Sequence, residues 1–426
     1  MNVSQKRILL ASPFFYPEPI STGKANQHLA EALAAEGHAL TVLCSHPLYP
    51  TWQPETSHAT LPGMTILRGG AHLRYPRSMP VRRMVLEAWF ALYAVRRAWK
   101  LRHQIDVLVS ILPPSLFALC LDRLLPRRVR RVAVIHDLQG VLAAQEKSLA
   151  RRLIIRMIQL VESRAFQAQD LLIFFSEDMA QAAQRAYRLE PQLCTVQYPF
   201  LTLPAANSDT AATLEAQFPA SRLHVVYSGA LGFKQNSHAM VQLMQIAAAR
   251  HPEIGFHVLS GGPFYEELRA EYARIPGPRV QFHPLVAPEN LAELYARSAI
   301  QIIPQAPGTE AGALPSKLPN LLAAGVYLLA LCPANSEVGR LLRRAGTGML
   351  VERWDEGLFL KKLDEALAIV RNEPAAVRRA QIQPLLAEFQ VSNLVAMVAG
   401  TRPRTPVVPD PEPVPEPVAL SGSFRG

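Results

Sequence analysis

The chain has 426 residues, which is too long for one small core and natural for two domains of about 200 residues each. Its formal net charge of +10 belongs to the first half, because residues 1–200 hold 24 Lys and Arg against 14 Asp and Glu, and the remainder holds 20 of each. The excess is concentrated between Arg68 and Arg164 and predicts an acidic partner surface, either nucleic acid or anionic lipid.

The cysteines and the first residues indicate the cellular compartment. The cysteines lie far apart without metal-ligand spacing, which predicts buried thiols in a reducing compartment. The start, MNVSQKRILLAS, leads from two basic residues into a short apolar strand, without the long apolar region of a secretory signal. We therefore expect a cytoplasmic protein. The cysteines are Cys44, Cys120, Cys194 and Cys332.

The first domain begins with a strand, a helix and a second strand. RILLAS at 7–12 predicts a strand, ANQHLAEALAAEGH at 25–38 predicts a helix, and ALTVLCS at 39–45 predicts the next strand. This βαβ unit implies a parallel sheet. Further strands are expected at 105–111, 131–137, 170–178 and 192–199.

Two helical stretches of this half combine apolar and basic residues, VRRMVLEAWFALYAVRRAWKLR at 81–102 and LARRLIIRMIQLVESRAF at 149–166. The first is too short and too interrupted to span a bilayer. Basic amphipathic helices can lie on an anionic membrane. The alternative is a pair of core-facing helices with solvated arginines, and the sequence leaves both interpretations open.

A second strand and helix series follows a stretch of small polar residues. Its strands are expected at 223–229, 255–262, 280–286, 299–305 and 326–332, and its helices near 237–250, 264–273, 289–297, 316–324, 336–344 and 355–371. The fold class is therefore α/β, with two Rossmann-like doubly wound domains whose strands all point their carboxyl ends into one interdomain cleft. The expected parts are a first domain over 1–200, a linker over 201–216, a second domain over 217–395 and a Pro-rich disordered tail over 396–426.

Two loops of the second domain are candidate phosphate sites. In YSGALGFKQ, Gly229 and Gly232 let backbone N–H groups approach a phosphate, and Lys234 adds a positive charge. In GALPSKLPNLLAAG, Ser316 is a good N-cap, and Lys317 places a charge at a helix N-terminus. The alternatives are a βα turn without a ligand and a capped helix with an exposed lysine.

Two candidates lie in the first domain. Gly23 follows the first strand in the loop STG, where the backbone can come close to a ligand. His136 and Asp137 end another strand, where the pair can orient a sugar hydroxyl or move a proton, although a lone His-Asp pair is often structural.

Together these segments resemble the glycosyltransferases of family 4, which have the GT-B fold. The resemblance covers about residues 6–395 and is carried by PFFYPEPISTGKANQHLAEALAAEGHALTVLCS, VYSGALGFKQ, HVLSGGPFYEEL, VQFHPLVAPENLAELYARSAIQIIPQ and LPSKLPNLLAAGVYLLA. GALG.KQ and LPSKL are similar to the colanic-acid and exopolysaccharide enzymes of that family.

The resemblance implies a retaining transfer of a sugar from a UDP- or GDP-linked donor, with no required metal or cofactor. It implies that Lys234 and Lys317 bind the diphosphate, that His136 and Asp137 touch the transferred sugar, and that Gly23 approaches the diphosphate or the acceptor. The substrate-binding set implied by the matched segments is Gly23, Gly229, Gly232, Gly262, Glu310, Ser316, Leu318 and Asn320.

Some positions depart from the family pattern. Ala230 stands where many members have an arginine, and Asn320 and Gly312 stand where many have two glutamates. Glu310 lies two residues from Gly312 and is a candidate substitute. An amide at 320 can still bond a ribose hydroxyl as donor and acceptor.

Three readings of the whole chain remain open at this point. The first is a transferase on the inner face of the plasma membrane, with an anionic lipid surface and a lipid-linked or polysaccharide acceptor as partners. The second is a nucleotide-sugar epimerase of the same fold, and the third is a non-catalytic scaffold of an envelope assembly. A nucleic-acid partner is least favoured, because the basic residues lack interleaved stacking aromatics.

Overall fold

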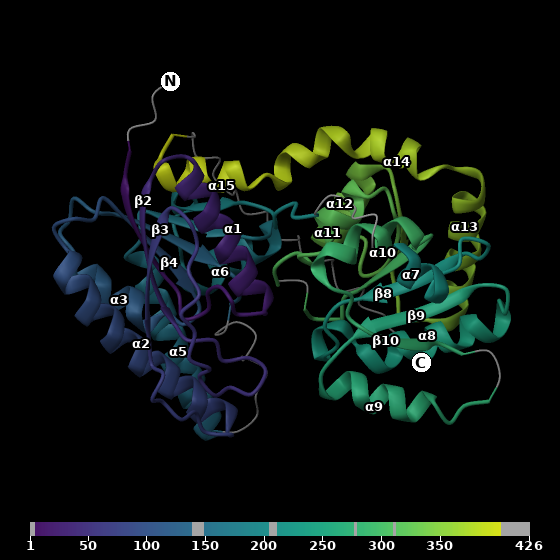
Figure 1. The fold of residues 1–426 in the computed structure, drawn as a ribbon, viewed down its shortest axis with the longest axis horizontal. Coiled ribbons are helices and arrows are strands. Elements are labelled where there is room, and N and C mark those ends of the chain that lie inside the picture. The colour runs from purple at the N-terminus through teal and green to yellow at the C-terminus, as the bar shows by residue number, and fades with distance from the viewer. Residues whose placement is uncertain (1–4, 139–148, 204–210, 277–278, 310–311, 402–426) are drawn as a thin grey trace, which may run out of the picture.

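The protein consists of two parallel sheets lying side by side, each covered by helices on both faces (Figure 1). The computed structural model describes residues 5–138, 149–203, 211–276, 279–309 and 312–401. The predicted pair of doubly wound α/β domains is therefore present.

The first sheet has the strand order β3-β2-β1-β4-β5-β6-β7, with parallel pairing throughout the described residues. Continuous apolar runs such as VLVSIL in β4 form strands that are buried on both faces. The strands are β1 (Arg7–Ala11), β2 (Ala39–Ser45), β3 (Met64–Gly69), β4 (Val107–Leu112), β5 (Arg130–Ile135), β6 (Leu171–Phe174) and β7 (Cys194–Val196). The helices are α1 (Ser21–Ala35), α2 (Met79–Leu101), α3 (Leu116–Leu124), α5 (Leu149–Gln167) and α6 (Glu177–Tyr187).

The second sheet has the order β10-β9-β8-β11-β12-β13 and is also parallel over the described residues. Its strands are β8 (His224–Ser228), β9 (Gly255–Ser260), β10 (Gln281–Pro284), β11 (Ile300–Pro304), β12 (Tyr327–Leu331) and β13 (Met349–Val351). Its helices are α7 (Ala211–Gln217), α8 (Ser237–Arg250), α9 (Pro263–Tyr272), α10 (Leu291–Arg297), α11 (Leu318–Ala323), α12 (Glu337–Ala345), α13 (Glu356–Asn372) and α14 (Ala375–Ile382).

After α14 the chain returns to the first domain. Helix α15 (Val391–Ala399) lies over the first sheet in Figure 1, and its Leu394, Val395 and Val398 are fully buried in the first core, beside α1. The sequence did not predict this helix, because the expected boundary between the second domain, 217–395, and the tail, 396–426, falls inside it. Residues 402–426 of that tail lie outside the described residues.

One helical segment among the described residues, Ala375–Ala399, is long and apolar enough to cross a membrane. Half of its apolar window is buried inside the protein. Since its two ends, α14 and α15, pack on different domains, its apolar character is explained by core packing.

Some elements differ from the sequence expectation. Strand β3 was not expected from the sequence. It is an edge strand that is only half-buried, so its residues show no clear run of apolar side chains. Helix α7 begins at Ala211, inside the expected linker over 201–216, and its Leu214 is buried in the second core. Strand β5 ends at Ile135, so His136 and Asp137 lie just beyond its carboxyl end.

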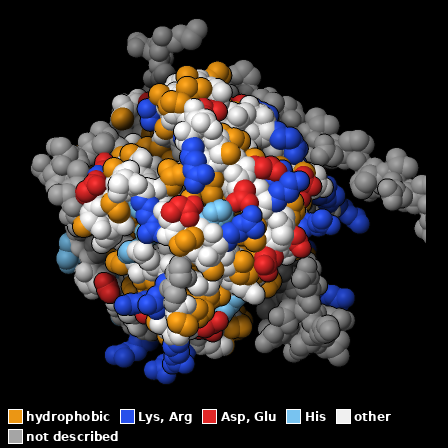
Figure 2. All heavy atoms as spheres, turned by 90° about the vertical axis from the view of Figure 1, so that its right-hand side faces the viewer, with side chains coloured by type: hydrophobic (Ala, Val, Ile, Leu, Met, Phe, Trp, Pro, Cys, Tyr) orange, Lys and Arg blue, Asp and Glu red, His pale blue; other side chains and the backbone are white. Residues whose placement is uncertain are grey.

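Helices α2, α3 and α5 cover one face of the first sheet (Figure 1). The inner face of α2 packs in the core through residues such as Phe90, and its partly buried Glu87 accepts N–H bonds from Ser115 and Leu116 at the start of α3. Its outer face leaves Leu92 73% exposed. On the second domain, by contrast, Figure 2 shows basic and acidic side chains interspersed over the visible face.

Candidate functional site

A cavity of about 510 Å³ lies between the two domains, at the carboxyl ends of their strands. Both domains line it, as expected for two parallel sheets that face one cleft. It brings together predicted residues from loops far apart in the sequence: His136, Gly229, Ser316, Lys317 and Asn320.

The ammonium group of Lys317 is enclosed at the floor of this cavity. Its Nζ donates to the carbonyl oxygen of Ser228 at 2.9 Å and lies 4.1 Å from the centre of the Tyr227 ring. Burial lowers the pKa of Lys317 to about 7, because the charged form loses its hydration. No carboxylate forms an ion pair with it among the described residues, so an anion entering the cavity would stabilise its charge.

His136 faces the same cavity from the first domain. Its ring lies 4.7 Å from the ring of Phe175, and its Nε2 has no hydrogen-bond partner within the described chain. Burial lowers the pKa of His136 to about 3, so its imidazole is neutral at pH 7. A neutral ring with an unsatisfied nitrogen can exchange one hydrogen bond with a sugar hydroxyl.

Lys234 and Asp137 form an ion pair across the cleft. The Nζ of Lys234, in the loop after β8, lies 3.1 Å from Oδ2 of Asp137, after β5. Both side chains are partly exposed, so the pair is screened by water and contributes little to stability. A diphosphate would therefore compete readily with Asp137 for this lysine.

Gly23 lies in the first turn of α1, and its conformation is ordinary for a helix. A Cβ at this position would come within 2.7 Å of the carbonyl oxygen of Glu18, so the packed chain itself requires a glycine here. The neighbouring residues reach the cavity instead. Ser21, Thr22, Lys24 and His28 line its first-domain wall, and no acidic residue lies in that first turn.

Sequence reasoning missed these wall residues. The signal was available in STGKANQH, where a helix starts with hydroxyl groups and a lysine and lacks the usual acidic residue.

Asn320 lines the cavity, but its amide is engaged with the segment that joins the domains. Its Oδ1 accepts the backbone N–H of Thr202 at 2.8 Å, and its Nδ2 donates to the Thr202 hydroxyl at 3.1 Å. The carbonyl oxygen accepts with one of its two lone pairs, and the second Nδ2 proton stays available to a ligand.

The predicted residues Leu318, Gly232 and Gly262 do not line this cavity. Leu318 is fully buried in the second core, so its side chain serves packing. Gly232 lines a separate hollow of about 280 Å³, next to the exposed Phe233. Gly262 precedes α9 with a φ of 92°, a conformation that favours glycine, and Glu310 lies outside the described residues.

Among the described residues, no group of three or more His, Cys, Asp or Glu is placed to hold a metal ion. The positive groups that face the cavity are side chains of lysine, namely Lys317 and Lys24, with Lys234 paired to Asp137 across the cleft. The arrangement is therefore suited to a negatively charged ligand bound by side-chain cations.

Comparison with known proteins agrees with the resemblance seen in the sequence. Residues 23–203 match the model of Glycosyltransferase Family 4. The chain is 24% identical over 356 residues, or 79% of this chain and 85% of the other, to WcaI of Escherichia coli (strain K12), described as a colanic acid biosynthesis glycosyl transferase.

Solved structures of glycosyltransferases share the fold over nearly the whole chain. Sucrose-phosphate synthase from Thermosynechococcus elongatus matches with a TM-score of 0.69 and 18% identity, over 93% of this chain and 98% of that one. WaaG, a glycosyltransferase involved in lipopolysaccharide biosynthesis, matches with a TM-score of 0.66 and 14% identity, over 92% and 100%. Anabaena HepE, solved with UDP-glucose, matches with a TM-score of 0.62 and 15% identity, over 93% and 99%.

These matches confirm the resemblance, the GT-B fold and the enzyme class expected from the sequence. The epimerase and scaffold alternatives gain no support from them.

The burial of Lys317 predicts a pH dependence of nucleotide-sugar binding. In the free protein this lysine is mostly charged at pH 6 and mostly neutral at pH 9, since its pKa is about 7. A bound diphosphate favours the charged form, so affinity should fall as pH rises, by up to about tenfold per unit above pH 7. Calorimetry with UDP-glucose and GDP-mannose, whose diphosphates keep a constant charge over this range, measures the slope.

Two variants test whether the slope comes from Lys317. Lys317→Met should bind weakly with little pH dependence, whereas Lys234→Met should bind weakly and keep the wild-type slope. Affinity of the wild-type protein that stays constant from pH 6 to pH 9 would contradict this assignment.

Proposed function

We propose that this chain, which has the GT-B fold and matches the model of Glycosyltransferase Family 4 over residues 23–203, moves a sugar from a nucleoside-diphosphate sugar to a lipid-linked or polysaccharide acceptor. The donor is UDP- or GDP-linked, and the product is a glycan of the cell envelope. The observation that carries the proposal is the single cavity in which Lys317 of one domain and His136 of the other face the same space.

We assign the binding of the donor's diphosphate to the second domain. Lys317, with its lowered pKa and no carboxylate partner among the described residues, gains most when a phosphate approaches. Lys234 exchanges Asp137 for the same diphosphate and adds a second positive charge. Two lysines that balance the charge of the leaving diphosphate can perform the electrostatic work that a metal ion performs elsewhere. We therefore propose transfer without a required metal. Retention of configuration is proposed on the resemblance to family 4 alone.

The first domain is assigned the reacting sugar and the acceptor. His136 lines the cavity, and we assign it to the transferred sugar, with its buried Nε2, unpaired among the described residues, as the atom that would bond a hydroxyl. Asp137, once released by Lys234, lies at the same strand end and can accept a bond from a hydroxyl. Lys24 on the cavity wall supplies positive charge for an acceptor that carries phosphate, and the ring of His28 lies on the same wall.

The class of acceptor is supported by the relatives. WcaI is described as an enzyme of colanic acid biosynthesis, and WaaG as an enzyme of lipopolysaccharide biosynthesis. Colanic acid and lipopolysaccharide are both glycans of the cell envelope. Synthesis of such a glycan on a lipid carrier would place the acceptor at a membrane.

The basic first domain supports work at the cytoplasmic face of such a membrane. Leu92, Arg96 and Trp99 lie on one face of α2, four and seven residues apart, and all three are exposed. On α5, Met157 is 55% exposed beside the exposed Arg156. Apolar side chains flanked by arginines suit insertion among anionic head groups.

Transfer itself is tested with purified protein, a panel of UDP-, GDP- and TDP-sugars, and acceptor extracted from membranes. Nucleoside diphosphate should be released only when acceptor and the correct donor are both present. Lys317→Ala should lower turnover about 10²- to 10³-fold, the usual effect of removing one electrostatic donor. Release of a free epimer without acceptor, or unchanged turnover of Lys317→Ala, would contradict the proposal.

Membrane association is tested by sedimentation with phosphatidylcholine vesicles that contain phosphatidylglycerol. Binding should weaken as salt rises, because screening reduces the attraction of arginines to the lipid surface. The double variant Leu92→Glu/Trp99→Glu should no longer sediment. The matched control Val377→Glu changes another exposed apolar side chain, on the second domain, and should sediment like the wild type. Absence of binding at low salt, or equal binding by the double variant, would refute a membrane role for α2.

A further inference from the structure

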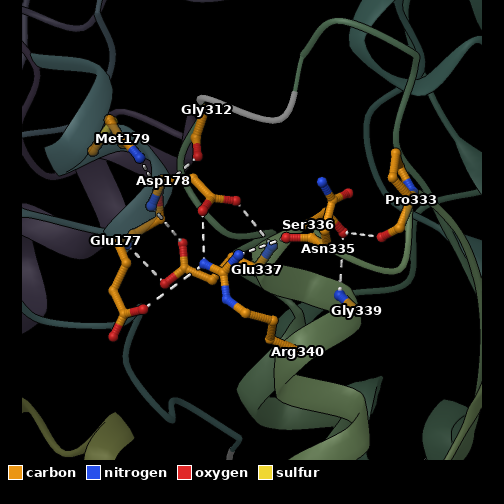
Figure 3. Close-up of polar contacts among 11 residues, drawn as sticks. Glu177, Asp178, Met179, Gly312, Pro333, Asn335, Ser336, Glu337, Gly339 and Arg340 are labelled. Atoms are coloured by element: carbon orange, nitrogen blue, oxygen red, sulfur yellow. Dashed lines mark hydrogen bonds and ion pairs between the residues drawn. The ribbon is translucent and has the colours of Figure 1, made fainter. Parts of the chain in front are cut away.

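The two domains meet at a second place, outside the cavity, where the N-termini of α6 and α12 face each other (Figure 3). Glu337 of α12 accepts the backbone N–H groups of Glu177 and Asp178, at 2.7 and 3.1 Å. In return, Asp178 accepts the backbone N–H of Glu337 at 2.9 Å. Each helix therefore receives a carboxylate from the other domain at its positive end.

This reciprocal cap is added to ordinary capping within each helix. Ser176 already accepts an N–H in the first turn of α6, and Ser336 does the same for α12. The carboxylates satisfy further N–H groups that a helix start leaves open. Since each helix already has a cap from its own domain, neither needs a partner from the other domain in order to form. The reciprocal bonds therefore serve to hold the two domains together.

Three charged side chains and one neutral phenol lie around Glu337. Glu177 and Asp178 come from α6, Arg340 from α12, and the phenol of Tyr198 from the segment after β7. Arg340 donates to Asp178 at 2.6 Å and so bridges the same two helices. Burial is the largest effect and raises the pKa of Glu337 to about 7. At pH 8 the group is therefore mainly a carboxylate, able to accept both N–H bonds.

Direct contacts of Ser176 and Phe175 connect the reciprocal cap to the first-domain and the second-domain sides of the cavity. The hydroxyl of Ser176 donates to the carbonyl oxygen of Gly312 at 2.8 Å, and Gly312 belongs to the loop that leads to Lys317. Phe175, the preceding residue, lines the cavity and packs on the ring of His136. The residues that follow β6 thus contact the loop of Lys317, the ring of His136 and the start of α12.

We propose that Glu337 and Asp178 are positioning residues that set the separation of the two domains at which His136 and Lys317 face the same cavity. The inference rests on the proposed glycosyl transfer, since it gives these two carboxylates a role in aligning the halves of that site. Neither side chain lines the cavity, so neither is assigned to bind the donor or to act on the sugar.

The interdomain distance tests the alignment without reference to activity. Spin labels at the exposed positions of Lys100 and Lys361 report the distance between the domains in the full-length protein at pH 8, in a Cys120→Ser background. Glu337→Ala and Asp178→Ala should give a broader or longer distance distribution than the wild type. Glu337→Gln is a second, milder variant that keeps one acceptor oxygen. Its distance distribution should therefore lie between that of the wild type and that of Glu337→Ala.

Asp355→Ala is the matched control. Asp355 caps α13 by accepting the N–H of Leu358 at 2.8 Å, entirely within the second domain. Its loss should lower stability by about 1 kcal/mol, as the loss of an N-cap usually does, and should leave the interdomain distance unchanged. A distance distribution in Glu337→Ala and Asp178→Ala equal to that of the wild type, or a change of the same size in Asp355→Ala, would overturn the inference.

Kinetics supply the second readout. The affinity for nucleotide sugar should stay within about twofold in the Glu337 and Asp178 variants, because the assigned diphosphate residues all belong to the second domain. Turnover should fall about 10- to 100-fold, the expected effect of displacing the reacting groups by about 1 Å. Unchanged turnover with a widened distance would refute the positioning role. If the wild type transfers no sugar, the proposed function fails, and the distance measurement still decides whether the carboxylates hold the domains.

Discussion

The placement of one positive charge inside the second domain governs the chemistry of the cleft. Lys317 is surrounded by a carbonyl oxygen and an aromatic ring, and burial removes the water that would otherwise stabilise its ammonium group. A carbonyl dipole and a π-face offset part of this loss. An anion would offset the remaining loss best, which is the reason for the proposal that this site binds the diphosphate of the donor.

The rest of the cleft follows from that site and from the direction of the strands. Two parallel sheets that point their carboxyl ends at each other place His136, Lys24 and the loop of Lys317 around a common space. His136 is buried and neutral, so it adds a hydrogen bond without adding a charge that would compete with the lysines. The ion pair of Lys234 with Asp137 is exposed to water, so a diphosphate could replace Asp137 at little cost.

Local patterns in the sequence predicted the strands of both sheets except β3 and β13, the two glycine and lysine loops, and the meeting of these loops at one edge. The motif GALPSKLPNLLAAG predicted that Lys317 lies at the start of a helix that follows a strand, and the structure has it there because such a loop is a local feature. The sequence did not indicate that the ammonium lies against Tyr227, since ring and lysine are brought together only when β8 and α11 pack.

Other features depend on contacts between residues far apart in the chain. Glu337 and Glu177 are bonded across 160 residues, and Asn320 and Thr202 across 118, so no short motif contains either pair. The same reason explains α15, whose apolar face has no partner until the chain returns to the first domain. The glycine at position 23 was interpreted as a ligand contact, whereas its neighbour Glu18 already requires it.

The central claim is that Lys317 and Lys234 together bind the diphosphate of the donor. A crystal structure of the protein with its nucleotide sugar tests it most directly. The account predicts phosphate oxygens within hydrogen-bond distance of both Nζ atoms, with Lys234 released from Asp137 and the sugar beside Nε2 of His136. A diphosphate bound elsewhere on the second domain, with the pair between Lys234 and Asp137 intact, would contradict it.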